Sequence, residues 1–479
     1  MGEIVTSIRR HDHVLVLALG AVACAVAGAT AVHPGSLPVL VTAGLCALAI
    51  AVIFGEVGFG ALLVWVGLSG PLFPLLSIGA TDTPLSFDRL MIAGMGTWLV
   101  FGRPGLRLSP QARRLAWGLA LLLVAYGVRA ALTHHIGPAS SEEGDARTAA
   151  INTWIDAIVL PATLYLVVAR FALTREICLR LAGAMAVGGA ILGSIGIAEK
   201  LAGFELSTFS GGEERIDTSI NVVRIAGPYS VPEVFGVVLL MCMAATLWWM
   251  LAHGSAVWPW GLVAIGLELG GIAVTLFRAA AIGAILVLIC GLGLRPGRVL
   301  RMVGVMLLAG CVLYLVYTQL ESNRVFESRV ANTENINGRF ATYQQGADVF
   351  ASHPLVGVGI GQFANAQTDV QVTVVNGVKP AQSPHSTFVG TLGEQGLAGF
   401  VPLLFVTYAI WRLLGELRRR ARDPADVVLW GCLVGAALAY LIMSLTLTML
   451  PYGASNAFFA ILLGLAAARS AALGAEDAE

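Results

Sequence analysis

The chain has little charge for its length. Only 12% of its 479 residues are Asp, Glu, Lys or Arg, whereas 57% are hydrophobic. A water-soluble domain is about a quarter charged, so a globule of this composition would have too few polar groups to cover its surface. The composition therefore excludes a soluble fold and predicts a protein that is embedded in lipid.

The sequence also lacks an excess of either charge and lacks paired cysteines. Basic and acidic residues number 29 each, and because nucleic-acid binding relies on a concentrated basic surface, we expect no nucleic-acid partner. The seven cysteines are scattered in or beside apolar runs without Cys-x-x-Cys spacing. This distribution argues against a disulfide framework and against a structural zinc site.

Long apolar runs are abundant instead. A membrane-spanning helix needs about 20 predominantly apolar residues, and about 14 runs approach this length. They cover residues 14–32, 37–54, 57–76, 89–102, 115–132, 154–172, 178–197, 228–251, 259–276, 279–294, 302–318, 387–414, 427–449 and 452–470. We interpret the first run as a retained helix rather than a cleaved signal peptide. The predicted fold is an all-α, polytopic helical membrane bundle with about 12–14 transmembrane helices.

Basic residues beside short loops predict which side of the membrane each loop faces, because such residues stay in the cytoplasm. The densest arginine clusters lie at 103–114, 175–180, 295–301 and 418–422. With 14 spans and a cytoplasmic N-terminus, all four clusters fall inside. The run 259–294 is read either as two short helices or as one long kinked helix. Removing one helix there would move the later clusters outside, so we favour two.

The polar segments between spans are longest on the predicted external side, at roughly 133–153, 198–227 and 319–386. The last is too long for a structureless connection in a compact protein. Its residues Phe340, Tyr343, Ala347 and Phe350 recur at helical spacing. We therefore expect short helices in this external loop.

The predicted organisation has four parts. These are N-terminal transmembrane helices (1–200), central transmembrane helices (201–318), the external loop (319–386) and C-terminal transmembrane helices (387–479).

Two arginines stand at predicted external membrane edges. Ionisable groups there are costly and commonly functional. Arg278 interrupts an apolar run, and Arg224 shortly precedes the span that begins at 228. The guanidinium group suits bidentate contacts to phosphate, so the pair suggests a phosphate clamp. The alternative for Arg278 is a side chain that reaches the headgroups without further function.

Three further residues complete the candidate site. His385 lies where the long loop re-enters the membrane, and a neutral imidazole can take a proton from a hydroxyl near neutral pH. Arg339 begins an amphipathic stretch of the loop, where it is either a phosphate contact or a solvated residue. Glu394 either supports the site or caps a helix break. An ordinary hydrogen-bonded histidine at a helix edge is the alternative for His385.

Other features carry less weight for function. The glycine run 357–361 has no flanking strand and helix that a nucleotide fingerprint demands, so we expect a tight turn there. Glu56, Asp156, Glu233 and Glu268 lie mostly near span ends rather than along a path through the bilayer. A polytopic transporter or flippase for a lipid-linked or anionic solute remains the alternative function. It predicts polar residues spread through the membrane, whereas these candidates gather on one side.

The ordered motifs resemble those of the O-antigen ligase / O-antigen polymerase family of bacterial membrane proteins. The resemblance covers roughly residues 220–415. It rests on Arg224-x-x-Gly227, Thr275-Leu276-Phe277-Arg278, Gly338-Arg339, His353-Pro354-Leu355-Val356-Gly357-Val358-Gly359, and His385 followed by Glu394-x-Gly396-x-x-Gly399. Family members usually have Asn after the loop histidine, where this chain has Ser386.

The resemblance implies a GT-C type membrane glycosyltransferase of cell-surface polysaccharide biosynthesis, as in lipopolysaccharide or exopolysaccharide assembly. Such an enzyme moves a glycan from an undecaprenyl-pyrophosphate donor to a hydroxyl of a glycan, lipid or protein acceptor, with inversion and without metal or other cofactor. His385 would be the base, Arg224, Arg278 and Arg339 would bind the pyrophosphate, and Glu394 would support the site. The implied location is the bacterial inner membrane, with the site on the periplasmic or external face.

Overall fold

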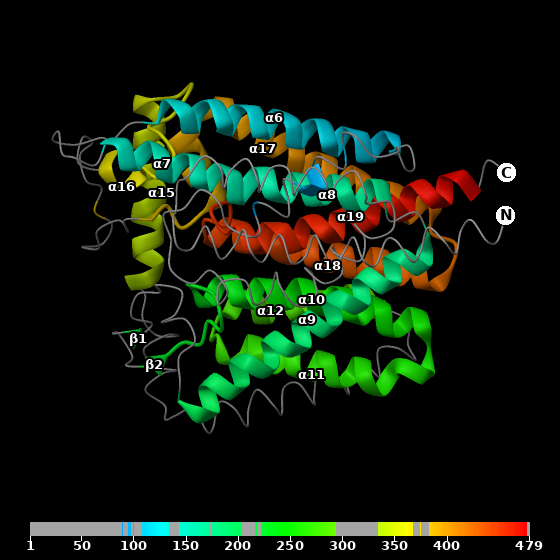
Figure 1. The fold of residues 1–479 in the computed structure, drawn as a ribbon. Helices are drawn as coiled ribbons and strands as arrows, with labels where there is room; N and C mark the ends of the chain where they lie inside the picture. Colours follow the sequence, from blue (N-terminus) through cyan, green and yellow to red (C-terminus); the bar gives the residue numbers. More distant parts are fainter. Residues whose placement is uncertain are drawn as a thin grey trace, which may run out of the picture.

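The computed structural model describes residues 89, 94–96, 99, 108–133, 143–171, 174–203, 216–217, 222–293, 334–366, 374 and 383–476. These residues form a helical bundle (Figure 1), which confirms the predicted all-α polytopic class. Eight of the described helices are long and apolar enough to cross a membrane, and a shorter apolar helix spans Arg278–Leu292. Predicted spans 14–32, 37–54, 57–76 and 302–318 lie outside the described residues, and 89–102 is described only at scattered positions. The full count of 12–14 and the four-part division stay predictions.

The helices follow one another in a simple order. In chain sequence they are α6 (Pro110–Leu132), α7 (Glu143–Trp154), the π-helix η2 (Ile155–Val159), α8 (Leu160–Phe171), α9 (Arg175–Ala202), α10 (Pro232–His253), the 3-10 helix η4 (Ser255–Val257), α11 (Trp258–Val274), α12 (Arg278–Leu292), α15 (Glu334–Ser352), α16 (Phe363–Ala366), α17 (Thr387–Arg420), α18 (Pro424–Thr446) and α19 (Gly453–Glu476). Between α9 and α10, the two-residue strands β1 (Ile216–Asp217) and β2 (Val222–Val223) pair antiparallel, with Ile216 opposite Val223.

Several helices begin at residues suited to capping. The side chains of Ser109, Thr174 and Asp423 accept backbone N–H groups in the first turns of α6, α9 and α18. Pro110 and Pro424 occupy the first helical positions of α6 and α18, where proline has no hydrogen bond to lose. These capping contacts determine where the helices begin, and packing between the helices holds the bundle together.

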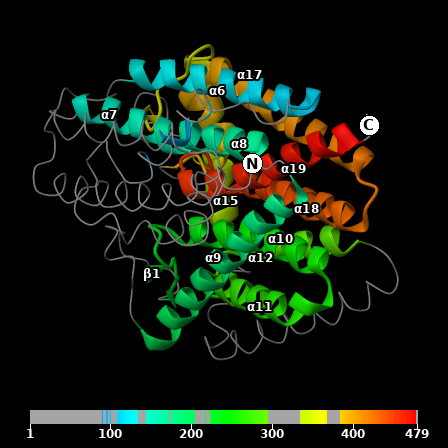
Figure 2. The same cartoon turned by 45° about the vertical axis from the view of Figure 1, so that its right-hand side comes forward.

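The long helices run antiparallel to their neighbours in the chain (Figures 1 and 2). Helices α6, α9, α11 and α18 end on the side where α15 lies, whereas α10, α12, α17 and α19 begin there. We call this side the α15 end and the other the opposite end. Among the described spans α10 is the most enclosed, since 89% of its most apolar stretch is buried inside the bundle. The α15 end therefore collects the start of this central helix and the starts of α12, α17 and α19.

Helix α15 lies across the ends of the bundle rather than along it (Figure 1). It packs on α17, where Gly346 has room for no side chain because Val389 lies against it. The Tyr343 hydroxyl donates to the carbonyl of Leu445 at the end of α18, 2.8 Å away. The helix predicted from the spacing of Phe340, Tyr343, Ala347 and Phe350 is confirmed, and it is a single element of 19 residues.

The region 259–294 forms two helices, as the arginine clusters predicted. Helix α11 ends at Val274 and α12 begins at Arg278. Between them Leu276 has a φ of 53°, a left-handed conformation that a helix cannot continue through. Arg278 therefore stands at the start of a helix and not within a kinked one.

Helix α17 is broken near its beginning. Gly396 has φ 59° and ψ −156°, which is not helical. The rings of Phe388 and Phe400 have centroids 6.4 Å apart, whereas 12 residues of straight helix would separate them by about 18 Å along the axis. Residues 387–395, which we call the first segment of α17, therefore fold toward the span that follows Gly396.

Candidate functional site

His385 is held in an uncommon backbone conformation at the α15 end. It lies two residues before α17, is partly buried and has a φ of 47°. The chain is fixed directly after it, because the Ser386 side chain accepts the N–H of Val389 and the N–H of Thr387 donates to the carbonyl of Leu447 at 3.1 Å. A left-handed non-glycine residue persists where its surroundings impose it, and such residues cluster at functional sites.

Charged side chains from two other helices act on His385. Burial lowers the pKa of His385 below its usual value, and the nearby Arg339 guanidinium on α15 lowers it further. The Glu233 carboxylate, from the first turn of α10, opposes this shift. The net direction keeps the imidazole neutral, and a neutral imidazole is the form that can accept a proton.

Arg224 approaches the same group from the segment before α10. Its Nη2 atom lies 2.7 Å from Oε1 of Glu233, and its Nε donates to the carbonyl of Thr275 at 3.2 Å. The neighbouring N–H of Ile225 donates to the carbonyl of Val274. Arg224 is thus attached both to the start of α10 and to the break between α11 and α12. Its side chain keeps 18% of its surface exposed.

Arg278 is the first residue of α12, immediately after that break. Its side chain is exposed, and within the described part of the chain it makes no hydrogen bond or ion pair. A helix N-terminus has unpaired N–H groups and a partial positive charge, which favour anions. Arg278 adds a full positive charge at that position, three residues from the carbonyl that holds Arg224.

The structure therefore brings four of the five predicted residues to the α15 end as a connected set. His385 and Arg339 interact electrostatically, Glu233 links His385 to Arg224, and Thr275 links Arg224 to the start of α12. Glu394 belongs to a separate group of contacts, described next. The chemical roles assigned to these residues from the sequence stay predictions.

The glycine run 357–361 docks onto the break in α17. The N–H of Val358 donates to the carbonyl of Gly393 at 3.0 Å, and that of Gly359 to the carbonyl of Glu394 at 2.8 Å. At Gly357, φ is 65° and a Cβ would lie 2.2 Å from the backbone of Glu394 and Gln395. The predicted tight turn is found, and its glycines permit close contact between two backbones.

Glu394 holds this turn in place. Its carboxylate accepts the backbone N–H groups of Gly361 and Phe363. Arg129, near the end of α6, donates to the carbonyl of Gly357 at 2.9 Å and so fastens the turn from its other side. Glu394 was predicted either to support the site or to cap a helix break. These contacts favour the second interpretation, because they place its carboxylate at the break in α17.

The match to known proteins covers this same part of the chain. The sequence model of the O-antigen ligase family matches residues 261–404. This part of the chain is therefore similar to the O-antigen ligase family. The matched region runs from α11 to the middle of α17 and contains Arg278, Arg339, His385 and Glu394, whereas Arg224 lies before it. A search of curated proteins finds no match.

Sequence reasoning missed three residues of the site. Glu233 was considered only as a step in an ion path, Arg129 was read as part of a span, and Tyr452 was not considered. Burial raises the pKa of Tyr452 to about 12, and the Glu233 carboxylate adds to that shift, which places the phenol in the same charged group. The one available signal was Glu233 itself, a carboxylate next to Pro232 at the start of a span.

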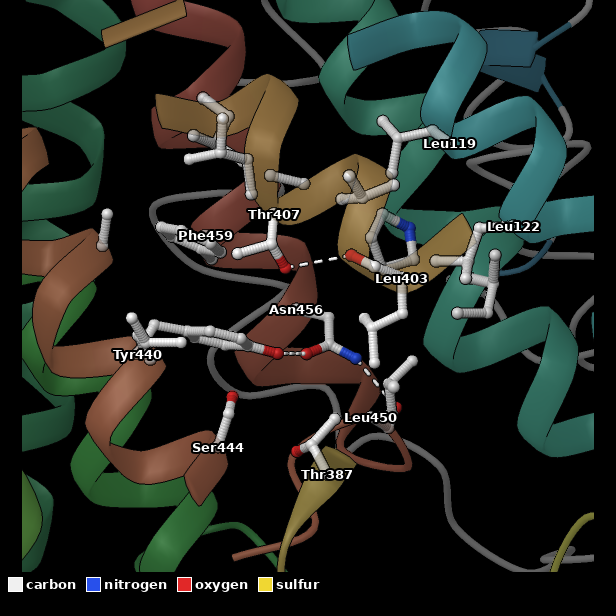
Figure 3. A pocket seen from close by; sticks show the side chains of 18 of the residues that line it. Leu119, Leu122, Thr387, Leu403, Thr407, Tyr440, Ser444, Leu450, Asn456 and Phe459 are labelled. Carbon is white, nitrogen blue, oxygen red and sulfur yellow. Dashed lines mark hydrogen bonds between the residues drawn. The ribbon is translucent and has the colours of Figure 1, made fainter. Parts of the chain in front are cut away.

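An apolar cavity lies within the bundle beside the first segment of α17 (Figure 3). Its volume is about 130 Å³, and its lining comes from α6, η2, α8, α17, α18 and α19. Thr387 and Ser444 lie at one side of it, and Tyr440 and Asn456 form a hydrogen-bonded pair in its wall.

Proposed function

We propose that this protein transfers a glycan from an undecaprenyl-pyrophosphate carrier to an acceptor hydroxyl at the α15 end. One observation carries the proposal: His385, Arg339 and the Arg224–Glu233 ion pair lie together at one end of the bundle. The lowered pKa of His385 favours its neutral form. A proton acceptor beside several cations is what transfer from a pyrophosphate requires. The family match supports the same class of reaction.

The α15 end is assigned to the periplasmic or external face of the bacterial inner membrane. Arginine clusters at the starts of α6 and α9 and at the α17–α18 junction all lie at the opposite end. Basic residues next to spans remain on the cytoplasmic side. A lipid-linked glycan that reaches the site from the external leaflet would meet His385 and the arginines together.

In this reaction the bond between the anomeric carbon and the pyrophosphate breaks, and the electron pair leaves with the pyrophosphate. Preorganised cations stabilise the charge that develops on a leaving group. Arg278 at the helix start and Arg224 beside it would make these contacts, and Arg339 would add a third. Without donor, Glu233 is the ion-pair partner of Arg224. When the donor binds, its phosphate would replace Glu233 as the partner of Arg224.

The other half of the reaction needs a base for the acceptor. The acceptor hydroxyl attacks the anomeric carbon while its proton passes to a ring nitrogen of His385. Attack opposite the leaving group inverts the configuration at that carbon. The proposal needs no metal. Among the described residues no group of three His, Cys, Asp or Glu side chains gathers as potential metal ligands.

The test is a transfer assay on the full chain in membranes or detergent with an undecaprenyl-pyrophosphate glycan donor. We expect His385→Ala to lower the rate about 100-fold or more, and Arg278→Ala to lower it by about 100-fold, with EDTA harmless to the parent. His253→Ala and Arg180→Ala are matched controls, because both residues are exposed at the opposite end. Unchanged turnover in His385→Ala would remove the proposed base.

The same assay separates transfer from transport. Donor movement across vesicle membranes without any transfer by the parent would favour a flippase over a glycosyltransferase. In that case changes at His385 would leave the movement intact.

A further inference from the structure

Helices α6 and α17 lie side by side and antiparallel in both views (Figures 1 and 2). Two contacts fix their register. A side-chain carbon added at Gly118 would lie 3.0 Å from the ring of Phe405, and the Ser109 hydroxyl donates to Glu416 at 2.6 Å. Toward the opposite end of the bundle, the start of α6 therefore lies level with the last turns of α17.

Each of these helices carries an exposed apolar stripe. The stripe of α6 includes Trp117, Leu121 and Val128, and that of α17 includes Val401, Leu404 and Tyr408. Spacings of three, four and seven residues place each set on one face of its helix. Trp117 adjoins Gly118, and the Tyr408 ring centroid lies 6.4 Å from that of Phe405. The two stripes therefore meet along the line where α6 packs on α17, and together they form a surface that we call the α6–α17 face.

Both stripes end in exposed arginines at the opposite end. Arg113 and Arg114 precede Trp117 on α6, and Arg412 follows Tyr408 on α17. Arg113 comes four residues after Ser109 and Arg412 four residues before Glu416, so the register of the antiparallel helices places these arginines at one level. Arg412 also lies over the Tyr408 ring, with its Cζ 5.8 Å from the centroid. Three positive charges thus gather at the end of one apolar surface.

No acid of the described helices neutralises these three arginines. Arg114 donates to the side-chain oxygen of Gln111 at 3.1 Å, and neither Arg113 nor Arg412 makes an ion pair within the described residues. Helix α6 contains no Asp or Glu. Glu416, the acid of α17 at this end, is 6% exposed and pairs with Arg420 at 2.8 Å. The exposed arginines therefore keep their full charge toward the surroundings of the bundle.

We propose that the α6–α17 face binds an anionic phospholipid of the cytoplasmic leaflet. The phosphate would lie among Arg113, Arg114 and Arg412, because guanidinium groups suit bidentate contacts to phosphate, and the acyl chains would follow the two stripes. Basic residues next to a span attract anionic headgroups. The leaflet rests on the sidedness given under the proposed function, whereas the binding itself does not depend on glycan transfer.

Selectivity for charge separates this proposal from a simpler interpretation. Arginines at a membrane edge can reach any headgroup without preference. A zwitterionic headgroup carries its own ammonium group, which offsets the attraction of three guanidinium groups for its phosphate. A built site should therefore prefer phosphatidylglycerol over phosphatidylcholine with the same acyl chains.

The test measures this preference beside Trp117, which keeps 65% of its surface exposed and is thus open to a quencher in the lipid. The full chain is reconstituted in phosphatidylcholine nanodiscs that contain a small fraction of phosphatidylglycerol with brominated acyl chains. Brominated phosphatidylcholine at the same fraction is the reference. Bromine quenches nearby indoles, and the difference between the parent and Trp117→Phe isolates the signal of Trp117 from those of the other tryptophans.

We expect brominated phosphatidylglycerol to quench Trp117 more strongly than brominated phosphatidylcholine. Arg114→Gln should weaken phosphatidylglycerol binding about fivefold, and Arg114→Gln combined with Arg412→Gln about 25-fold, from the attraction that each basic residue contributes near an anionic headgroup. Arg113→Gln combined with Arg114→Gln tests the same cluster without altering α17. The matched control is Arg180→Gln, since Arg180 is exposed at the same end but belongs to α9 and pairs with Glu176.

Equal quenching by the two lipids in the parent would overturn the proposal. So would equal losses in Arg180→Gln and Arg114→Gln, because the attraction would then come from the whole end of the bundle. A dimer that shields Trp117 from both lipids would assign the α6–α17 face to a second copy of the chain instead.

Thermal unfolding in detergent gives a second readout that needs no fluorescence. Phosphatidylglycerol should raise the Tm of the parent, since a ligand that binds the folded state stabilises it. The rise should shrink in the Arg114→Gln, Arg412→Gln double variant and persist in Arg180→Gln. The same rise with phosphatidylcholine would contradict a site that recognises the negative charge.

Discussion

The two ends of the bundle use arginine in different ways. At the opposite end Arg469 makes two hydrogen bonds of 2.8 and 2.9 Å to Asp426, with side chains only 7% and 0% exposed. Arg420 pairs with Glu416, which also accepts from Ser109 at 2.6 Å. At the α15 end Arg278 is exposed and Arg339 acts on a histidine. Cations paired with acids hold helix ends together, whereas cations without such partners are available to an anionic ligand.

The pairing at the α15 end is also of a different kind. Arg224 and Glu233 keep 18% and 17% of their side-chain surfaces exposed, so a ligand can reach them. A desolvated pair such as Arg469–Asp426 offers no such access. The difference teaches that arginine joins helices where its ion pair is enclosed, and stays accessible to a ligand where its ion pair is open to solvent.

The largest expected effect concerns the enclosed ion pair at the opposite end. Asp426→Asn would leave the enclosed Arg469 without its charge partner, and breaking a buried pair costs about 3–5 kcal/mol of stability. Asp423→Asn changes the half-exposed pair with Arg175 and should cost at most about 1 kcal/mol. Thermal unfolding in detergent measures both. Equal losses in the two variants would contradict the distinction between enclosed and open pairs.

The next largest effect concerns the glycine turn that docks onto α17 at the α15 end. Gly357→Ala places a methyl group 2.2 Å from the α17 backbone at a φ of 65°, and strain plus overpacking should cost about 2–4 kcal/mol. Gly361→Ala has a similar φ of 74° but no atom within 4 Å, so it should cost only about 1–2 kcal/mol. Unfolding and transfer assays on both variants compare them. Identical behaviour would show that contact with α17 is unimportant.

The smallest effect tests the charges around the proposed base. The proposed reaction needs neutral His385, so its rate should fall as pH drops through the pKa of that imidazole. Arg339 lowers that pKa and Glu233 raises it. Arg339→Gln should therefore move the acidic limb of the pH–rate profile to higher pH, and Glu233→Gln should move it to lower pH.

Arg339→Lys is the control for this pair of variants, because it keeps the positive charge and should leave the limb near that of the parent. Shifts of the same sign in Arg339→Gln and Glu233→Gln would argue against His385 as the group that titrates.

Much of the fold could be predicted because a membrane-spanning helix is recognised from the local run of apolar residues alone. The α11–α12 break followed from Arg278 together with the side on which later arginines must lie, and α15 followed from four residues at helical spacing. The break in α17 was only an alternative interpretation of Glu394. The docking of the glycine turn onto that break could not be predicted, since residues 357 and 395 meet only through the fold.

The candidate site residues could be named from the sequence, but the contacts that connect them could not. Arg224 and His385 are far apart in sequence, and nothing local indicates that Glu233 stands between them. Arg129 was hidden because it lies near the end of an ordinary span. The cavity has no sequence signal, because most residues of its wall are the same apolar types that occur along the outer faces of the helices.

The amino-acid sequence by itself determined that this protein is a helical membrane protein, where most of its described spans run, and which residues are candidates for a functional site. Hydropathy and charge decide whether a segment lies in lipid or in water, so their effect can be predicted for one segment at a time. Only the tertiary structure decided which arginines are paired, what acts on His385, and where the helices leave a cavity. These depend on distances between helices, and packing sets those distances over the whole bundle.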